Sequence, residues 1–138
     1  MGRWLADQGL APDHVISSPA TRAGKTAREI CSACDFDLDA VHWDERMYLS
    51  SVATMIEVLG ECPDSACRVF LIGHNPGMEG LLEYLTGYQV QPYDDGKLMP
   101  TAAIAQLQLS TDWCSLDSGT ATLKQKLRPS MLAESAKF

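Results

Sequence analysis

Two short apolar segments, each leading directly into a helix start, constrain the fold of this chain most strongly. Residues 14–17 (HVIS) precede residues 18–22 (SPATR), and residues 68–73 (RVFLIG) precede residues 74–77 (HNPG). The second apolar run is rich in branched and aromatic side chains, which is typical of a strand buried on both faces of a parallel sheet. Buried strands that alternate with helices predict an α/β fold.

Both junctions also carry the residues of a candidate anion site. Each pairs a capping residue, Ser18 or Asn75, with a proline that fits the first helical position. Arg22 and His74 then lie near the carboxyl ends of their strands, beside helix N-termini whose free N–H groups favour an anion. If the two strands are neighbours, Arg22 and His74 converge, and a guanidinium binds phosphate oxygens in a bidentate way. We therefore expect a phosphate or carboxylate site.

The rest of the chain completes an alternating pattern. Residues 103–109 and 119–127 alternate apolar with polar side chains, which predicts an antiparallel pair at the edge of a mostly parallel sheet. The long connection at 88–100 is expected to lie over the active edge. Other expected elements are a helix ending near residue 8, a helix over 20–31, a weak strand at 40–43, a helix starting at Ser50 or Ser51 and ending at Gly60, and a helix over 76–85.

Length and charge narrow the function classes. With 138 residues, 46% of them apolar, the chain is expected to form a single domain, residues 1–138. The formal net charge is −7 and the basic residues form no stripe, which argues against nucleic acid or an anionic membrane as a partner. The sequence shows no apolar run of membrane-spanning length and no secretory signal, so we expect a cytoplasmic protein.

Five cysteines are present, an odd number, and we expect them to be reduced. The pair formed by Cys31 and Cys34 has the spacing of redox and zinc motifs. It lies at the end of a helix and lacks a second ligand pair, which favours a structural role.

The first residues suggest an incomplete unit. A helix at residue 1 followed by a loop and a buried strand is the second half of a βαβ unit whose first strand is absent, so we expect the domain to be truncated at its N-terminus. Loss of a strand exposes two strand edges, which the chain is expected to cover by self-association or strand exchange.

Several motifs together resemble the histidine phosphatase superfamily, specifically the small SixA-type phosphohistidine phosphatases. The resemblance is carried by residues 17–23 (SSPATRA) with 26–27 (TA), and by residues 71–77 (LIGHNPG). It extends through 100–102 (PTA) and 127–129 (LRP) and so covers nearly the whole chain. It implies a three-layer α/β/α sandwich of the phosphoglycerate mutase-like kind.

The resemblance also implies a chemistry. In that family a nucleophilic histidine takes the phosphoryl group before water releases it, while residues matching Arg22 and His74 bind its equatorial oxygens and stabilise the transition state. No metal or other cofactor is implied. The implied partners are a phosphorylated protein of the histidine phosphotransfer type, in signal transduction, and phosphate or another oxyanion.

The family's nucleophile belongs to an Arg-His motif on a first strand that this sequence lacks, so about 30 to 40 residues are expected to be missing. Neither His14 nor His42 matches that nucleophile by motif. Glu45 is a low-ranked candidate for a general acid, because an acidic residue near this point serves other branches of the superfamily.

Ser18, Asn75 and Thr101 are candidate residues of a supporting shell around the phosphate. Three functions stay open at this point. The first is phosphohistidine hydrolysis, impaired in this chain without its nucleophile. The others are a non-enzymatic phosphate-binding or regulatory module, and a small-molecule phosphomonoesterase of the same superfamily.

Overall fold

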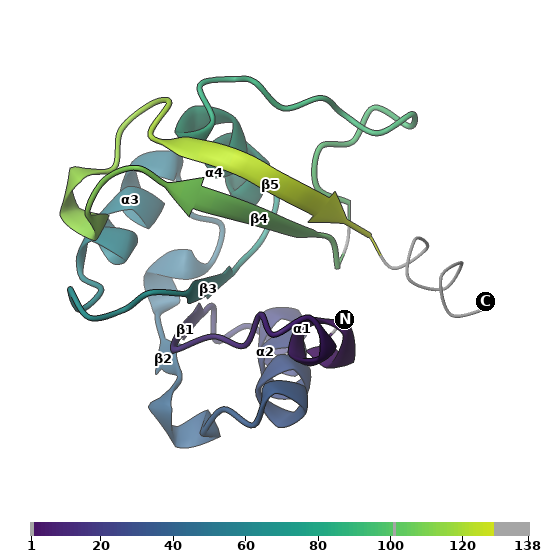
Figure 1. Ribbon diagram of the computed structural model, residues 1–138, viewed down its shortest axis with the longest axis vertical. Coiled ribbons are helices and arrows are strands. Elements are labelled where there is room, and N and C mark those ends of the chain that lie inside the picture. The colour runs from purple at the N-terminus through teal and green to yellow at the C-terminus, as the bar shows by residue number, and fades with distance from the viewer. Residues whose placement is uncertain (1, 101, 129–138) are drawn as a thin grey trace.

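The computed structural model describes residues 2–100 and 102–128 and shows an α/β arrangement (Figure 1). The elements are α1 (Gly2–Asp7), β1 (His14–Ser17), α2 (Thr21–Cys34), η1 (Leu38–Ala40), β2 (His42–Trp43), η2 (Glu45–Met47), α3 (Val52–Gly60), β3 (Val69–Ile72), α4 (Gly77–Leu85), β4 (Ile104–Leu109), η3 (Trp113–Ser115) and β5 (Ala121–Leu127). Both alternating segments form strands, as the sequence predicts.

The strands form two separate sheets. In the first, of order β2-β1-β3, both pairings are parallel, and Ser17 is in register with Ile72 across β1 and β3. The second is the antiparallel hairpin β4-β5. The predicted fold class, a mostly parallel sheet with an antiparallel pair, is therefore confirmed.

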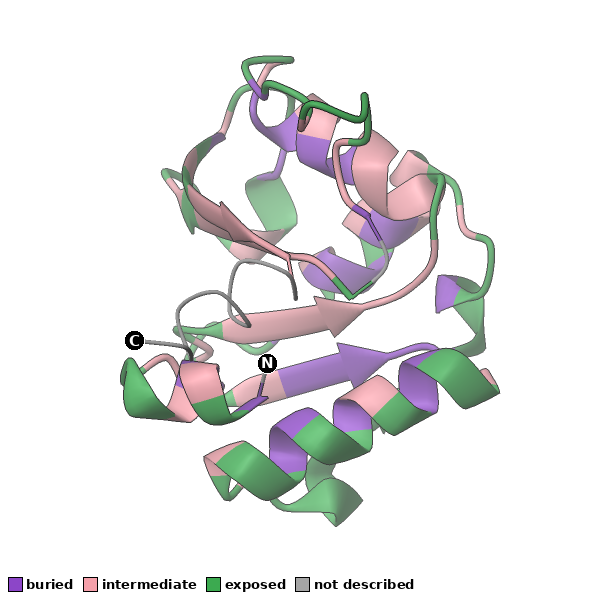
Figure 2. Ribbon diagram, turned by 90° about the vertical axis from the view of Figure 1, so that its right-hand side faces the viewer, coloured by how far each residue is buried: buried purple, intermediate pink, exposed green. Residues whose placement is uncertain are grey.

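Helices cover the three-stranded sheet on both faces because successive strand residues point in opposite directions. Val15 packs on one face with Cys31 of α2, and α1 packs against α2. Ile16 points to the other face, where it packs with Met55 of α3 and Leu81 of α4. Figure 2 shows the resulting layers, with the buried strand β1 next to the half-buried strand β3.

The helix caps differ from the sequence prediction at both junctions. The N-caps of α2 and α4 are Ala20 and Pro76, with no side-chain cap, rather than Ser18 and Asn75. The Ser18 hydroxyl accepts the N–H of Ala20, just before α2, and also bonds His74, whereas the Asn75 amide bonds Met99. The N-cap of α3 is Ser51, within the predicted start, and its hydroxyl accepts the N–H of Thr54.

Burial of β3 also differs from the prediction. The sequence indicates a strand buried on both faces, but all four residues Val69–Ile72 are only half-buried. One edge of β3 pairs with β1, and its residues also line a large cleft that faces β4. Strand β2 is short, with two exposed residues.

The start of α4 packs closely against the segment before α3 at Gly77. A Cβ at Gly77 would lie 2.5 Å from the carbonyl oxygen of Ser50. We expect Gly77→Ala to lower the free energy of unfolding by about 1–3 kcal/mol, because backbone atoms must move. The control is Gly24→Ala in α2, where the new Cβ meets the mobile end of Arg28 at 3.1 Å. Urea unfolding that shows equal stability for both variants contradicts this prediction.

The cysteines are free thiols, as the sequence predicts. Burial raises the pKa of both Cys31 and Cys34, which makes these thiols poor nucleophiles at neutral pH. In the described ranges 2–100 and 102–128, no helix has the length and apolar character needed to cross a membrane.

Candidate functional site

The site lies where β1 and β3 end side by side. Their parallel pairing continues past the strands, because the N–H of Ser18 donates to the carbonyl of Ile72 at 3.0 Å. Ser18 and His74 therefore leave the sheet at the same edge. Their side chains meet there, with 2.8 Å between His74 Nε2 and Ser18 Oγ.

Ser18 holds the imidazole from a fully buried position. Its Oγ accepts the N–H of Ala20 at 3.2 Å, and its own proton is available for donation to Nε2 of His74. When Ser18 donates in this way, the Nδ1 nitrogen of the ring is left free to donate to another group. The bond fixes the direction in which the imidazole faces.

Arg22 occupies the first turn of α2, four residues after Ser18. It is exposed and lines the same cleft as His74. None of the ion pairs among residues 2–100 and 102–128 involves Arg22, so its guanidinium is available to an anion. The adjacent pairing of β1 and β3 places Arg22 and His74 at one sheet edge, as their sequence context predicts.

Two cleft residues, Tyr48 and Leu49, were missed by the sequence prediction. The ring of Tyr48 meets that of His74 edge to face, with centroids 5.3 Å apart and an interplanar angle of 79°. Tyr48 is 58% exposed and Leu49 63%. Both residues follow β2, the third parallel strand. Because ligands bind at the carboxyl ends of parallel strands, the position of these residues after β2 could have identified them.

Asn75 and Glu79 attach the long connection to the start of α4. The side-chain amide of Asn75 donates to the carbonyl of Met99 at 2.6 Å, and Glu79 accepts the N–H of Met99 at 3.0 Å. The connection therefore runs past the site edge, as predicted. Thr101, the other predicted supporting residue, lies outside the described residues.

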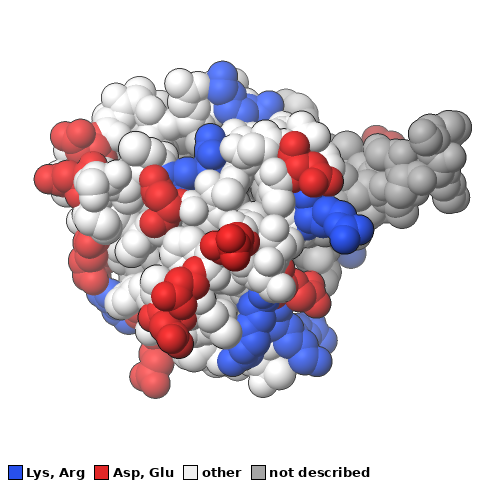
Figure 3. Space-filling model, turned by 60° about the horizontal axis from the view of Figure 1, so that its bottom comes forward, with Lys and Arg blue, Asp and Glu red and all other residues white. Residues whose placement is uncertain are grey.

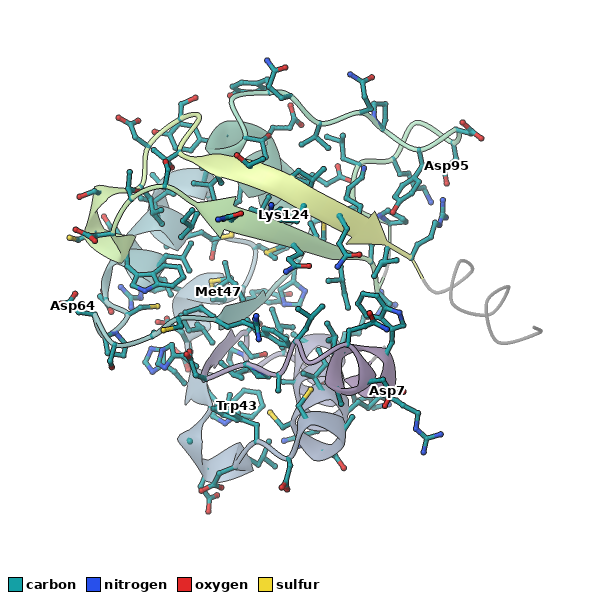
Figure 4. All side chains as sticks on the ribbon, in the orientation of Figure 1. Asp7, Trp43, Met47, Asp64, Asp95 and Lys124 are labelled. Atoms are coloured by element: carbon teal, nitrogen blue, oxygen red, sulfur yellow. The ribbon has the colours of Figure 1, made fainter. Side chains whose placement is uncertain are left out.

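Residue Lys126 of β5 and the neighbouring Arg128 contact the connection at 88–100. The Lys126 ammonium donates to the carbonyls of Gln91 and Leu98, each at 2.9 Å, and lies 4.3 Å from the Tyr93 ring centroid. Asp95 pairs with Arg128 at 3.2 Å, beside the carboxyl end of β5 (Figure 4).

The remaining candidates lie outside the cleft. His14 begins β1, at the opposite end of the strand from Ser18. His42 is half-exposed and bonds Asp44, with 3.0 Å between Nε2 and Oδ2. Glu45 is exposed in η2 and is not among the cleft residues. The structure therefore brings Ser18 and His74 into contact, places Arg22 in the first turn of α2 along the same cleft, and leaves Glu45 outside it.

A buried carboxylate stabilises the segment that carries Tyr48. The N–H of Asp44 donates to the carbonyl of Ser17, and its side chain, 7% exposed, accepts two bonds from the guanidinium of Arg46. Arg46 also pairs with Glu61 at 2.7 Å. Hydrogen bonding to Arg46 lowers the pKa of Asp44 to about 2 and also lowers the pKa of Glu61.

The face of the molecule in Figure 3 carries charges of both signs. Its acidic and basic side chains are interspersed, and the basic groups form no continuous stripe on this face. Within the described residues, no group of three or more His, Cys, Asp or Glu side chains is arranged to hold a metal ion.

Comparison with known proteins relates this chain to two kinds of protein. No protein-family model matches it. Two Mycobacterium tuberculosis proteins, MT1313 and Rv1276c, both described as uncharacterized, are each 29% identical over 126 residues, which is 88% of this chain and 77% of theirs.

The solved structures with a similar fold are SixA proteins. The SixA protein of Nakamurella multipartitia has a TM-score of 0.76 at 21% identity, covering 93% of this chain and 77% of its own. The protein histidine phosphatase SixA in complex with tungstate has a TM-score of 0.74 at 22% identity, covering 95% and 78%. SixA of Agrobacterium tumefaciens has a TM-score of 0.67 at 23% identity, covering 93% and 75%. This chain has the fold of the SixA-type histidine phosphatases.

Proposed function

We propose that this chain is the phosphate-binding part of a phosphohistidine phosphatase of the histidine phosphatase superfamily. The observation that carries the proposal is the 2.8 Å bond between His74 and the buried Ser18, directly before the helix turn that presents Arg22. An oriented imidazole and a guanidinium with no ion pair among the described residues, both at one sheet edge, are suited to a tetrahedral oxyanion. Tungstate, an oxyanion, is bound in one SixA structure of this fold.

The proposed roles follow from donor geometry. The Arg22 guanidinium binds two oxygens of the transferred phosphoryl group, and His74 donates to a third as negative charge develops. Ser18 keeps the imidazole directed at that oxygen, and Tyr48 restricts its ring. A phosphorylated imidazole is a good leaving group, so the reaction needs no contribution from Glu45.

The nucleophile is proposed to come from outside these 138 residues. Of the three histidines of the chain, His74 has the anion-binding role, His14 lies at the far end of β1, and His42 bonds Asp44. We propose that an Arg-His segment, placed on a strand before α1, supplies the histidine that carries the phosphoryl group.

The test compares two forms of the protein. One is the 138-residue chain, and the other carries an added N-terminal strand ending in Arg-His. Both are assayed for phosphate release from a phosphohistidine-bearing phosphotransfer protein. We expect release only by the extended form. Release by the short form that is lost in His74→Ala would make His74 the nucleophile and contradict the proposed roles.

A second function, phosphate binding without turnover, is favoured by the presence of a single histidine in the described site. NMR titration with phosphate or tungstate distinguishes it from an empty site. We expect the largest shifts at His74 and Arg22, and Arg22→Ala should weaken binding by about tenfold or more. Unchanged shifts at both residues would contradict every phosphate-based function. Release from a small phosphate ester by the extended form would instead identify a phosphomonoesterase.

A further inference from the structure

Tyr48 and Leu49 form a pair of exposed apolar side chains beside the candidate phosphate site. The large apolar side chains exposed among residues 2–100 and 102–128 are Leu38, Trp43, Tyr48, Leu49 and Tyr88. Tyr48 and Leu49 line the cleft that contains His74, and the other three do not. Single exposed apolar residues are common on protein surfaces, but adjacent ones beside a polar site indicate a surface that another molecule contacts.

The chain holds Tyr48 in a fixed place beside the end of β3. Met47, directly before it and labelled in Figure 4, is 1% exposed and belongs to the core shared with α3 and α4. A Cβ at Gly73, directly before His74, would lie 2.9 Å from Met47 Cε. The residues that precede Tyr48 and His74 therefore pack against each other. The Tyr48 N–H also donates to the carbonyl of Glu45 at 3.1 Å. The exposed ring thus stands on an anchored backbone.

Leu49 has an unfavourable backbone conformation. Its φ of 48° lies in the left-handed region, which is uncommon for a residue with a bulky side chain. Such strain persists only where the surrounding structure enforces it, and it clusters at functional sites. Here the buried Met47 precedes the turn, and Ser51, the N-cap of α3, follows it. Both the strain and the exposure of this pair are offset if a ligand contacts it.

Part of the Tyr48 ring is open to a ligand. The ring meets that of His74 edge to face, with 5.3 Å between the centroids and an interplanar angle of 79°. A contact of this kind covers only part of the tyrosine ring, and the side chain is 58% exposed. The cation–π contacts of the described residues involve the rings of Trp43 and Tyr93 instead. The uncovered part of Tyr48 is therefore free to contact a group bound in the cleft.

A group that binds through a phosphoryl oxygen comes within reach of this ring. An oxygen that accepts a hydrogen bond from His74 lies about 3 Å from the imidazole nitrogen. The Tyr48 and His74 centroids are 5.3 Å apart, and aromatic rings interact at centroid separations of about 4.5–7 Å. The carrier, meaning the group bonded to phosphorus, is one bond beyond the phosphoryl group. It is therefore close enough to contact Tyr48.

We propose that Tyr48 is a specificity-determining residue, whose ring contacts the carrier and favours a planar aromatic carrier over an aliphatic one. This inference rests on the proposed function, in which the carrier is the imidazole of a phosphohistidine. Paired aromatic rings gain an electrostatic attraction that an aliphatic ring of similar size lacks. Leu49 has no aromatic face, so it contacts either kind of carrier equally well. Aliphatic phosphate esters are therefore the poorer ligands.

The test uses the 138-residue chain and phosphonates, which are not hydrolysed. Phenylphosphonate has a planar aromatic carrier, and cyclohexylphosphonate has an aliphatic ring with the same number of carbons. Both dissociation constants are measured by NMR titration of the His74 signals, at a pH at which both ligands are dianions. Their ratio is compared between variants, because a change in His74 orientation alters both constants alike. We expect the original chain to bind phenylphosphonate about three- to tenfold more tightly.

Tyr48→Leu should reduce this preference to about one, because leucine keeps an apolar contact but has no aromatic face. Tyr48→Phe should retain the preference of the original chain. The matched control is Tyr88→Leu, which removes a tyrosine of similar exposure, 66%, from outside the cleft and should leave the ratio unchanged. Leu49→Ala should weaken the binding of both ligands and also leave the ratio unchanged.

Two results would overturn the proposal. One is equal or tighter binding of cyclohexylphosphonate by the original chain, since burial of apolar surface alone favours the aliphatic ring. The other is an aromatic preference that persists in Tyr48→Leu. If this variant does not fold, the Tyr48 ring-proton signals of the original chain decide. Phenylphosphonate should shift them through its ring current and cyclohexylphosphonate should not, and unchanged signals with phenylphosphonate would refute the contact.

Methylphosphonate separates this inference from the proposed function, because its carrier has no ring. Methylphosphonate that shifts the signals of His74 and Arg22, together with equal binding of the two ring-bearing phosphonates, would support the phosphate site and refute the role of Tyr48. Unchanged signals at His74 and Arg22 with all three phosphonates would contradict both the proposed function and the role of Tyr48.

Discussion

Replacing His74 by Ala should lower the rate of phosphate release by the Arg-His-extended form about 10²- to 10³-fold. An oriented donor to a developing oxyanion contributes that much when it acts in a partly closed site. Arg22→Lys should also reduce the rate, because Lys keeps the charge but loses the bidentate geometry. The measurement is single-turnover release from a phosphohistidine protein.

A matched control shows whether the effect belongs to the site. His14→Gln removes a histidine from the opposite end of β1 and should leave the rate unchanged. Ser18→Ala tests orientation, because it removes the 2.8 Å bond without touching the substrate. We expect a smaller loss in Ser18→Ala and a changed pH profile, since the ring tautomer is no longer fixed. Equal rates for His74→Ala and His14→Gln would place the chemistry elsewhere.

Replacing Asp44 by Asn should lower the free energy of unfolding by about 2 kcal/mol at neutral pH. Hydrogen bonding to Arg46 lowers the pKa of Asp44 from 3.8 to about 2 in the folded chain, and a tenfold change in a proton-binding constant corresponds to about 1.4 kcal/mol. The side chain is 7% exposed, so solvent screens this interaction little. Asn can accept one bond from Arg46 but carries no charge.

The same substitution should change the acid stability. A carboxylate whose pKa is lower in the folded state binds protons more readily when unfolded. Its contribution to stability is therefore complete above about pH 5 and is lost as the pH falls through about 2. Urea unfolding between pH 7 and pH 2 should show a steeper decline for the original chain than for Asp44→Asn.

Asp39→Asn is the control for charge alone, since Asp39 is exposed in the preceding turn. It should leave both the stability and its pH dependence nearly unchanged. Parallel stability curves for the original chain and Asp44→Asn would contradict a specific role of Asp44.

Local sequence patterns were sufficient for the order of elements. Apolar runs before capping and proline residues identified β1 and β3, and alternation identified β4 and β5, because these signals depend on neighbours within a few residues. The parallel pairing of β1 and β3 brings Arg22 and His74 to one edge, as their positions in the two junctions predicted.

The predicted N-caps of α2 and α4 were wrong for a physical reason. Ser18 and Asn75 have side chains that can cap a helix. Asn75 bonds the distant Met99 instead, and Ser18 combines a local bond from the N–H of Ala20 with a distant one to His74. A local pattern cannot weigh a distant hydrogen bond against a nearby one. Local patterns also failed to identify Tyr48, because its exposed ring contacts His74 only in the folded chain.

The sequence by itself therefore determined which elements form and which residues stand at the strand ends, since helix periodicity, strand periodicity and turn chemistry are local. Only the tertiary structure decided how the site is held. The bond between Ser18 and His74, the attachment of Met99 to Asn75 and Glu79, and the cleft lined by β3 and β4 all join residues distant in the chain. Their geometry depends on how the sheets and helices pack together, which no local pattern records.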